Sequence, residues 1–369
     1  MKRNRSFSIA LTALFCGFLG LFLALFLLLP KSDFSEKEKR VLAKAPKLTL
    51  SSMLDGSFEQ GFEDYLADHA PLRDILVGVN ACYEQLSLRN GLGDVIREKD
   101  GALAATPETV NEDRVRGSCE RINAFAEKTG LPVTVLLIPS VYAQAENSLP
   151  ALRELCRDDE AAALARETLS DDIPFLYPEE ELTRGMYYRT DHHLTSEGCF
   201  TAYNRFLRSL DRPVHSRDEY EIEQFEGFYG TAYAKSGLWL TDPDSVEIWQ
   251  SKAQGDVTVE FDDRAPSDSL FFREHLSELD QYPVFLDGNH ALVTIRTGVQ
   301  GENLLLIRDS FGHCFAPFAA DDFARITLVD LRYYRLPVSE LAKETDIDRV
   351  LVLYGMDTFL TGNDLVFLK

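Results

Sequence analysis

The sequence predicts an α/β fold with a mostly parallel sheet, preceded by one N-terminal transmembrane helix. From about Asn111, and again from Asn303 to the C-terminus, short apolar runs alternate with segments of helical periodicity, the pattern of βα units. The 369 residues, of which 45% are hydrophobic, are enough to bury a large core. The uncharged stretch 9–29 is long enough to cross a bilayer as a helix. These three observations define the expected architecture.

The N-terminal segment is predicted to be a retained membrane anchor. Lys2, Arg3 and Arg5 precede the apolar run, and basic residues stay in the cytoplasm. We therefore expect residues 1–8 inside the cell, a span at 9–30, and the remaining chain outside the cell membrane. A cleaved signal peptide is the alternative, but its apolar region is usually about 7–15 residues long and ends at a small-residue site. This run is longer and ends in leucines followed by Pro and Lys.

Charge and cysteine content exclude several classes of protein. The chain has 60 acidic and 38 basic residues, a net charge of −22, so phosphate backbones should repel it and nucleic acid is not an expected partner. Five of the six cysteines follow the anchor, and none forms a C-x-x-C pair. An odd number without ligand spacing predicts neither a disulfide framework nor a structural zinc site.

A polar tether and one large domain are expected after the anchor. Residues 31–50 are rich in Lys and Glu and show no sustained period, which is typical of a tether. The domain is expected to cover 51–369. It should start with two amphipathic helices, near 58–66 and 75–86, the second capped near Gly91.

The predicted sheet draws strands from both halves of this domain. A hairpin turns at Asp100-Gly101, which supplies the positive φ that such a turn needs. Strands are expected at 133–138, 174–177, 303–307, 325–331 and 350–354, and helices at 114–128, 159–169, 312–319 and 338–344. The polar stretch at about 211–286 has no clear period. We interpret it as an insertion on one continuous sheet, because neither half alone holds the usual 4–6 strands or so.

The first candidate catalytic segment precedes a predicted helix that Thr195 would cap. On an extended chain Asp191 and His193 leave the same face, whereas His192 leaves the opposite face. Asp191 could then accept the Nδ1 proton of His193 and direct Nε2 outward as a base. Surface histidines in a polar loop and a metal site are the alternatives.

The second segment places Ser310 directly after an apolar strand and before a helix that Gly312 opens. This is the carboxyl edge of the sheet, where open α/β proteins have their sites. The amides that start the helix could stabilise an oxyanion, although a plain N-cap serine is equally compatible. A serine at a strand end together with an oriented histidine is what acyl transfer requires.

The same residues resemble the DHHW family, which is similar to periplasmic alginate O-acetyltransferase domains and related to SGNH hydrolases. The resemblance rests on Phe34-Ser35-Glu36-Lys37-Glu38, Glu98-Lys99-Asp100-Gly101, Thr190-Asp191-His192-His193, Asp287-Gly288-Asn289-His290, Arg308-Asp309-Ser310-Phe311-Gly312 and Val329-Asp330-Leu331-Arg332-Tyr333-Tyr334. It implies a flavodoxin-like α/β/α sandwich of the SGNH type.

The resemblance also implies functional roles. Ser310 would be the nucleophile, His193 the base and Asp191 its orienting carboxylate. The substrate would be an exported polysaccharide or cell-wall glycan, and a polytopic membrane O-acyltransferase could supply acetyl groups. Two positions depart from the pattern: Leu194 stands where the family name has Trp, and Arg308 stands where a GDS-type hydrolase has Gly.

Four further residues are candidates for the oxyanion hole or substrate binding, besides the Ser310 amide. Gly288 and Asn289 place an amide side chain beside a flexible backbone, although Gly-Asn pairs are common in turns. Arg332 could bind a sugar hydroxyl or carboxylate, or form a surface ion pair, and Tyr333 lies beside it.

Three functions are compared on this basis. The leading hypothesis is a membrane-anchored O-acetyltransferase or acetylesterase that works through an acetyl-serine and needs neither metal nor cofactor. A metal-dependent hydrolase would use Asp191, His193, and His290 or His313, but no H-E-x-x-H motif or similar ligand pair is present. A non-catalytic glycan-binding or scaffold protein on a degenerate hydrolase fold is the third.

Overall fold

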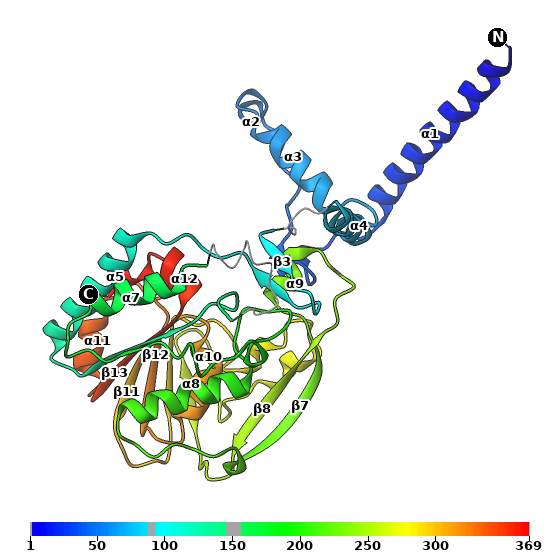
Figure 1. Cartoon of the computed structure of the whole chain (residues 1–369). Helices are drawn as coiled ribbons and strands as arrows, with labels where there is room; N and C mark the ends of the chain where they lie inside the picture. Colours follow the sequence, from blue (N-terminus) through cyan, green and yellow to red (C-terminus); the bar gives the residue numbers. More distant parts are fainter. Residues whose placement is uncertain (1, 88–92, 145–155, 369) are drawn as a thin grey trace. The chain divides into compact units, whose positions relative to one another are not determined.

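The computed structural model describes residues 2–87, 93–144 and 156–368 (Figure 1). The chain forms two compact units. One comprises Met1–Leu92 with Ala234–Trp239, and the other comprises Gly93–Tyr233 with Leu240–Lys369. The two helices after the predicted anchor therefore lie outside the unit that contains the sheet, whereas the sequence pattern suggested one domain from residue 51.

The N-terminal unit contains the long apolar helix α1 (Lys2–Leu28), the short strands β1 (Phe34–Ser35) and β2 (Arg40–Val41), and helices α2 (Leu50–Leu54), α3 (Ser57–Asp68) and α4 (Arg73–Leu86). Helices α3 and α4 confirm the two predicted amphipathic helices. The expected cap near Gly91 lies outside the described residues. The region expected as a tether is attached to α3, because Arg40 forms an ion pair with Asp68 and the Ala43 amide donates to the same carboxylate.

The larger unit is built on a seven-stranded sheet with the order β6-β5-β13-β11-β12-β10-β9. Its strands are β5 (Val133–Ile138), β6 (Phe175–Leu176), β9 (Thr258–Phe261), β10 (Leu292–Arg296), β11 (Asn303–Arg308), β12 (Arg325–Val329) and β13 (Arg349–Gly355). The strands from β6 to β12 are parallel, and β10 is antiparallel to both of its neighbours. The prediction of one mostly parallel sheet with strands from both halves is confirmed.

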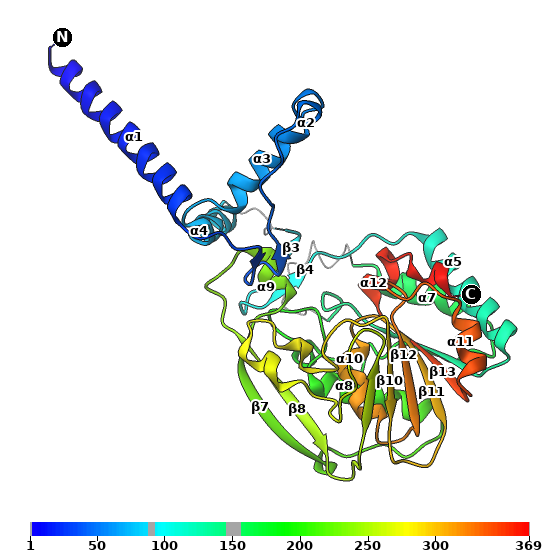
Figure 2. The same ribbon diagram turned by 180° about the vertical axis from the view of Figure 1, so that it is seen from behind.

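Helices cover both faces of this sheet (Figures 1 and 2). One face carries α5 (Glu112–Thr129), α7 (Asp158–Thr168), α11 (Val338–Glu344) and α12 (Met356–Thr361), and the other carries α8 (Ser196–Ser209) and α10 (Gly312–Ala319). The central strand β11 is buried by both helical layers, since Leu304 and Leu306 pack into one core, whereas Leu305 and Ile307 pack into the other. A strand buried on both faces is a continuous apolar run, so the sequence pattern located it correctly.

The insertion is more ordered than its sequence indicated. It contains a long antiparallel hairpin, β7 (Tyr220–Phe228) with β8 (Asp244–Ser251), and the short helix α9 (Thr231–Ser236). Strands β7, β8, β9 and β10 were not predicted. The alternation in β7 is interrupted because two consecutive residues, Glu223 and Gln224, are both exposed, and because a bulge between Glu226 and Phe228 shifts the register.

The remaining elements are short. The predicted hairpin is present as β3 (Val95–Arg97) and β4 (Leu103–Ala105). Single 3₁₀ turns cover Arg184–Met186 (η1), Arg217–Glu219 (η2), Arg273–Ser277 (η3), Tyr282–Val284 (η4) and Asp364–Phe367 (η5).

Candidate active site

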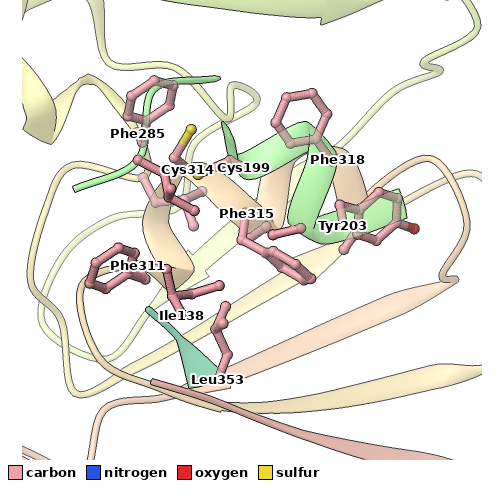
Figure 3. Packing of buried hydrophobic residues seen from close by; sticks show 14 of the residues in the cluster. Ile138, Cys199, Tyr203, Phe285, Phe311, Cys314, Phe315, Phe318 and Leu353 are labelled. Carbon is pink, nitrogen blue, oxygen red and sulfur yellow. The ribbon is translucent and has the colours of Figure 1, made fainter. Parts of the chain in front are cut away.

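Ser310 lies in the tight turn between β11 and α10, at the carboxyl end of a central strand. The buried Asp309 carboxylate fixes this turn, because it accepts hydrogen bonds from the amides of Phe311 and Gly355, both at 2.9 Å. Gly355 has no room for a side chain: a Cβ there would lie 2.3 Å from the Phe311 ring. Figure 3 shows Phe311 among the buried apolar residues of this core, with Ile138 and Leu353 drawn below it. The serine is thus held at the sheet edge, as predicted.

Ser310, His193 and Asp191 form a continuous chain of hydrogen bonds. The Ser310 hydroxyl lies 2.7 Å from Nε2 of His193, and Nδ1 of the same ring lies 2.5 Å from Oδ1 of Asp191. With the ring neutral, its Nδ1–H donates to the carboxylate and its Nε2 accepts from the hydroxyl. The serine and the histidine are 117 positions apart in sequence, so the fold brings the two predicted segments together.

The local geometry of the histidine segment differs from the prediction. The segment is not extended but folds into a loop, closed by a bridge between Tyr187 and Leu194. The His193 amide donates to Oδ1 of Asp191 at 2.9 Å, which bends the chain over His192. The two histidine rings therefore lie side by side, with centroids 4.0 Å apart, and not on opposite faces. The side chain of His193 still meets Asp191, but through a turn.

Residues of the insertion orient Asp191. The Thr231 amide donates to its Oδ2 at 2.5 Å. The Thr190 hydroxyl donates to Asp244 at 2.5 Å and accepts from the Gly230 amide at 3.0 Å. Gly230 lies so close to the carboxylate that a Cβ would be 2.1 Å from Cβ of Asp191 and 2.4 Å from its Oδ2. Sequence reasoning missed these contacts because their partners are 40 to 54 positions apart and have no recognisable motif.

Tyr282 packs against the imidazole of His193. The two rings are nearly parallel, at 13°, with centroids 4.0 Å apart. The Tyr282 hydroxyl donates to the carbonyl oxygen of Ser310 at 3.2 Å, so one side chain contacts both histidine and serine. Burial raises the pKa of Tyr282 well above its ordinary value, which keeps the phenol protonated and able to donate.

A buried polar network lies behind the serine. Arg308 is fully buried and donates to Asp330 at 3.2 Å and to Nε2 of His313 at 2.5 Å. Burial lowers the pKa of the Arg308 guanidinium, and Asp330 opposes this effect. Burial and the nearby Arg308 charge also hold the pKa of His313 well below its usual range, so this ring is neutral. Arg332 donates to Asp330 at 2.9 and 2.6 Å and to Asn289 at 3.2 Å.

The residues predicted as oxyanion or substrate contacts differ in the partners that they have in the structure. The Gly288 amide donates to the Phe285 carbonyl at 3.3 Å, in a turn where Gly288 has φ +82°. Tyr333 is exposed beside the Arg332 guanidinium. Among the described residues, neither Asn289 nor Arg332 forms a hydrogen bond with Ser310 or His193, and the Ser310 amide makes none at all. The Ser310 amide is therefore the available donor at the nucleophile.

The alternative metal-ligand set, Asp191 and His193 with His290 or His313, is not among the groups of close ligand atoms in the described part of the chain. Asp191, His192 and His193 have potential ligand atoms within 4.8 Å of one another, as do Asp262, Asp263 and His290. Both nitrogens of His193, however, are engaged by Asp191 and Ser310. Nδ1 of His290 instead contacts Asp263 at 2.8 Å. The geometry at His193 fits proton transfer better than metal binding.

This site can be compared with known proteins. Residues 179–329 match the DHHW protein family. The match includes Asp191, His193 and Ser310, and it confirms the predicted resemblance. None of the curated proteins compared with the chain matches it in sequence. Leu194, where the DHHW name has Trp, is buried in the core beside the site.

Solved structures share the fold. A DHHW family protein from Eubacterium siraeum is 22% identical, with a TM-score of 0.63 over 74% of this chain and 93% of its own. Bacillus cereus PatB1 with a sulfonyl adduct is 17% identical, with a TM-score of 0.64 over 74% of this chain and 98% of its own. These likenesses confirm the predicted α/β/α fold.

Proposed function

We propose that the protein is a membrane-anchored O-acetyltransferase or acetylesterase, which modifies an exported polysaccharide or cell-wall glycan through an acetyl-serine intermediate. The observation that carries this proposal is the hydrogen-bond chain from Ser310 through His193 to Asp191. Acetyl is the proposed transferred group because the chain matches the DHHW family, which resembles alginate O-acetyltransferase domains.

The first half-reaction would form the acyl enzyme. Oγ of Ser310 attacks the acetyl carbonyl while its proton passes to Nε2 of His193. Asp191 stabilises the resulting imidazolium through Nδ1. When the tetrahedral intermediate collapses, the bond to the donor oxygen breaks and that oxygen takes the proton from Nε2. The acetyl group is then an ester on Ser310.

The second half-reaction reverses these steps with a new nucleophile. A glycan hydroxyl or a water molecule gives its proton to Nε2 and attacks the acetyl ester, and Ser310 leaves with the same proton. Transfer and hydrolysis thus use the same residues and differ in which hydroxyl enters. The Ser310 amide would stabilise the oxyanion in both halves. Asn289, Gly288, Arg332 and Tyr333 remain proposed substrate contacts.

The N-terminal helix would keep this chemistry at the cell membrane. Phe7–Leu28 is long and apolar enough to cross a bilayer, and Lys2, Arg3 and Arg5 precede it. We propose that it is a retained anchor with the larger unit outside the cell. A polytopic membrane O-acyltransferase is the proposed source of acetyl groups.

Mass spectrometry of the purified protein tests the proposal. Incubation with a chromogenic acetyl ester should add one acetyl group to Ser310, and a sulfonyl fluoride should block the same residue. Ser310→Ala should remain folded and take neither group, whereas Ser277→Ala, which changes an exposed serine of the same unit, should behave as wild type. Adding a glycan acceptor would separate transfer from hydrolysis. A folded Ser310→Ala protein that turns over the ester normally would exclude this mechanism, and a wild type that binds glycan but never acylates would indicate a scaffold.

A further inference from the structure

Helix α4 exposes an apolar stripe. Leu72, at its N-cap, and Ile75, Leu76, Val79, Tyr83 and Leu86 recur at intervals of three and four residues, so they lie along one face. Each of these side chains is between 53 and 84% exposed. An amphipathic helix of a soluble domain normally turns such a face toward the core.

The opposite face of α4 is the one that is packed. Ala81 is buried, and the indole of Trp239 lies so close to Gly78 that a Cβ there would be 2.8 Å from the ring. The Trp239 Nε1–H also donates to the carbonyl of Asp74 at 2.8 Å. Trp239 belongs to the same compact unit as α4. The face of α4 that carries Asp74, Gly78 and Ala81 is therefore packed within the unit, while the apolar stripe is directed away from it.

The start of α4 lies close to the end of the apolar helix α1. The ring of Tyr65 in α3 meets the ring of Phe26 near the end of α1, with centroids 5.9 Å apart. The Lys31 ammonium lies 3.7 Å from the centre of the Phe26 ring and donates to the carbonyl of His69 at 3.4 Å. His69 directly follows α3, and Arg73 begins α4. These contacts fix the connection between α3 and α4 at the carboxyl end of the candidate span.

Exposed apolar side chains are concentrated in this unit. Of the large apolar side chains that the described part of the chain exposes after Leu29, 14 lie between residues 34 and 86 and only four lie beyond. The chain has a net charge of −22, yet residues 31–47 carry six basic and three acidic side chains. An apolar helix face next to a basic segment is the combination that binds the surface of an anionic bilayer.

We propose that α4 lies in the membrane–water interface, with its apolar stripe immersed in lipid. This inference depends on the proposed retention of α1 as a membrane anchor. The occupant of the stripe is the phospholipid bilayer itself, because the stripe begins where the span ends. Aliphatic side chains enter the acyl boundary, and Tyr83 fits the amphipathic zone that tyrosine prefers. The N-terminal unit would thereby have two attachments, one through the bilayer and one along its surface.

Fluorescence quenching in proteoliposomes tests this location with the full-length chain. A nitrobenzoxadiazole label is attached to Val79→Cys in a background with Cys16, Cys82 and Cys156 changed to Ser. The remaining thiols, Cys119, Cys199 and Cys314, are buried, and burial raises the pKa of Cys119 to about 12, which keeps it unreactive. Asn80→Cys, at the edge of the stripe on the same helix, and Glu120→Cys, exposed on α5, are the matched controls.

In vesicles of phosphatidylcholine and phosphatidylglycerol, we expect iodide to quench the label at position 79 about threefold less than the label at position 120. Lipids with a nitroxide near the headgroup should quench position 79 strongly, position 80 less and position 120 not at all. Equal iodide quenching at 79 and 120 would overturn the proposal. Shielding from both quenchers that disappears on diluting the protein in lipid would assign the stripe to a second copy instead. Protein that sodium carbonate extracts from the vesicles would show that the anchor itself has failed, which is a separate outcome.

Discussion

Replacing Gly230 by Ala should abolish most of the acetyl turnover without unfolding the protein. The added methyl group would lie 2.1 Å from Cβ and 2.4 Å from Oδ2 of Asp191, whereas nonbonded carbon atoms prefer about 3.5–4.0 Å. Asp191 must therefore move by about 1 Å or more away from His193. A displacement of about 1 Å costs on the order of 10²-fold in rate, and complete loss of the orienting carboxylate about 10⁴-fold. We expect kcat/KM to fall within this range, which corresponds to about 3–5 kcal/mol of transition-state stabilisation.

The measurement pairs chromogenic acetyl-ester kinetics with thermal unfolding. Overpacking at Gly230 should lower the free energy of unfolding by about 1–3 kcal/mol, so the variant should remain folded at 25 °C. Gly255→Ala is the control, since Gly255 also lies in the insertion and a Cβ added there would meet no other atom within 4 Å. A folded Gly230→Ala protein with kcat/KM within about threefold of wild type would refute the orienting role of Asp191.

Three further outcomes are expected. His193→Ala should lose nearly all acetyl turnover, whereas His192→Ala should retain most of it, because Nε2 of His193 is the nitrogen that hydrogen-bonds to Ser310; the reverse result in steady-state kinetics would contradict the assignment. Hydrogen bonding to Asp322 raises the pKa of His215 to about 9. The contribution of protonated His215 to the free energy of unfolding is therefore fully present below about pH 6.5 and is lost as the pH rises past 9. His215→Gln should therefore remove on the order of 1–2 kcal/mol of that pH dependence in urea unfolding, and an unchanged profile would contradict it. Protease added to spheroplasts should digest everything beyond the span, and a protected full-length band would reverse the proposed topology.

The sequence alone determined the five parallel strands of the main sheet and the position of the serine. Strand β11 is a continuous apolar run because it is buried on both faces, and Gly312 marks the start of the helix that follows it. The Thr195 cap was equally predictable, since its hydroxyl accepts from the Gly198 amide within one helical turn. These features depend on local periodicity and capping, which are determined by residues close together in the sequence.

Long-range contacts decided the geometry of the site. The insertion showed no period, yet Thr231 and Gly230 contact the Asp191 carboxylate and Tyr282 stacks on His193. The extended geometry expected for the histidine segment was wrong, because a carboxylate can bend its own chain by accepting an amide two residues later. Neither outcome follows from side-chain alternation.

Helix α4 is a second case in which packing against distant residues decided what the sequence pattern could not. Its sequence correctly predicted an amphipathic helix, since the pattern of Ile75, Val79 and Leu86 depends only on the 3.6-residue turn. The tertiary structure decided which face is buried, because Trp239 packs against Gly78 on the other side and lies 165 positions from its hydrogen-bond partner in the helix. Periodicity specifies that a helix has two faces, but only packing against distant residues determines which of them is left for a partner.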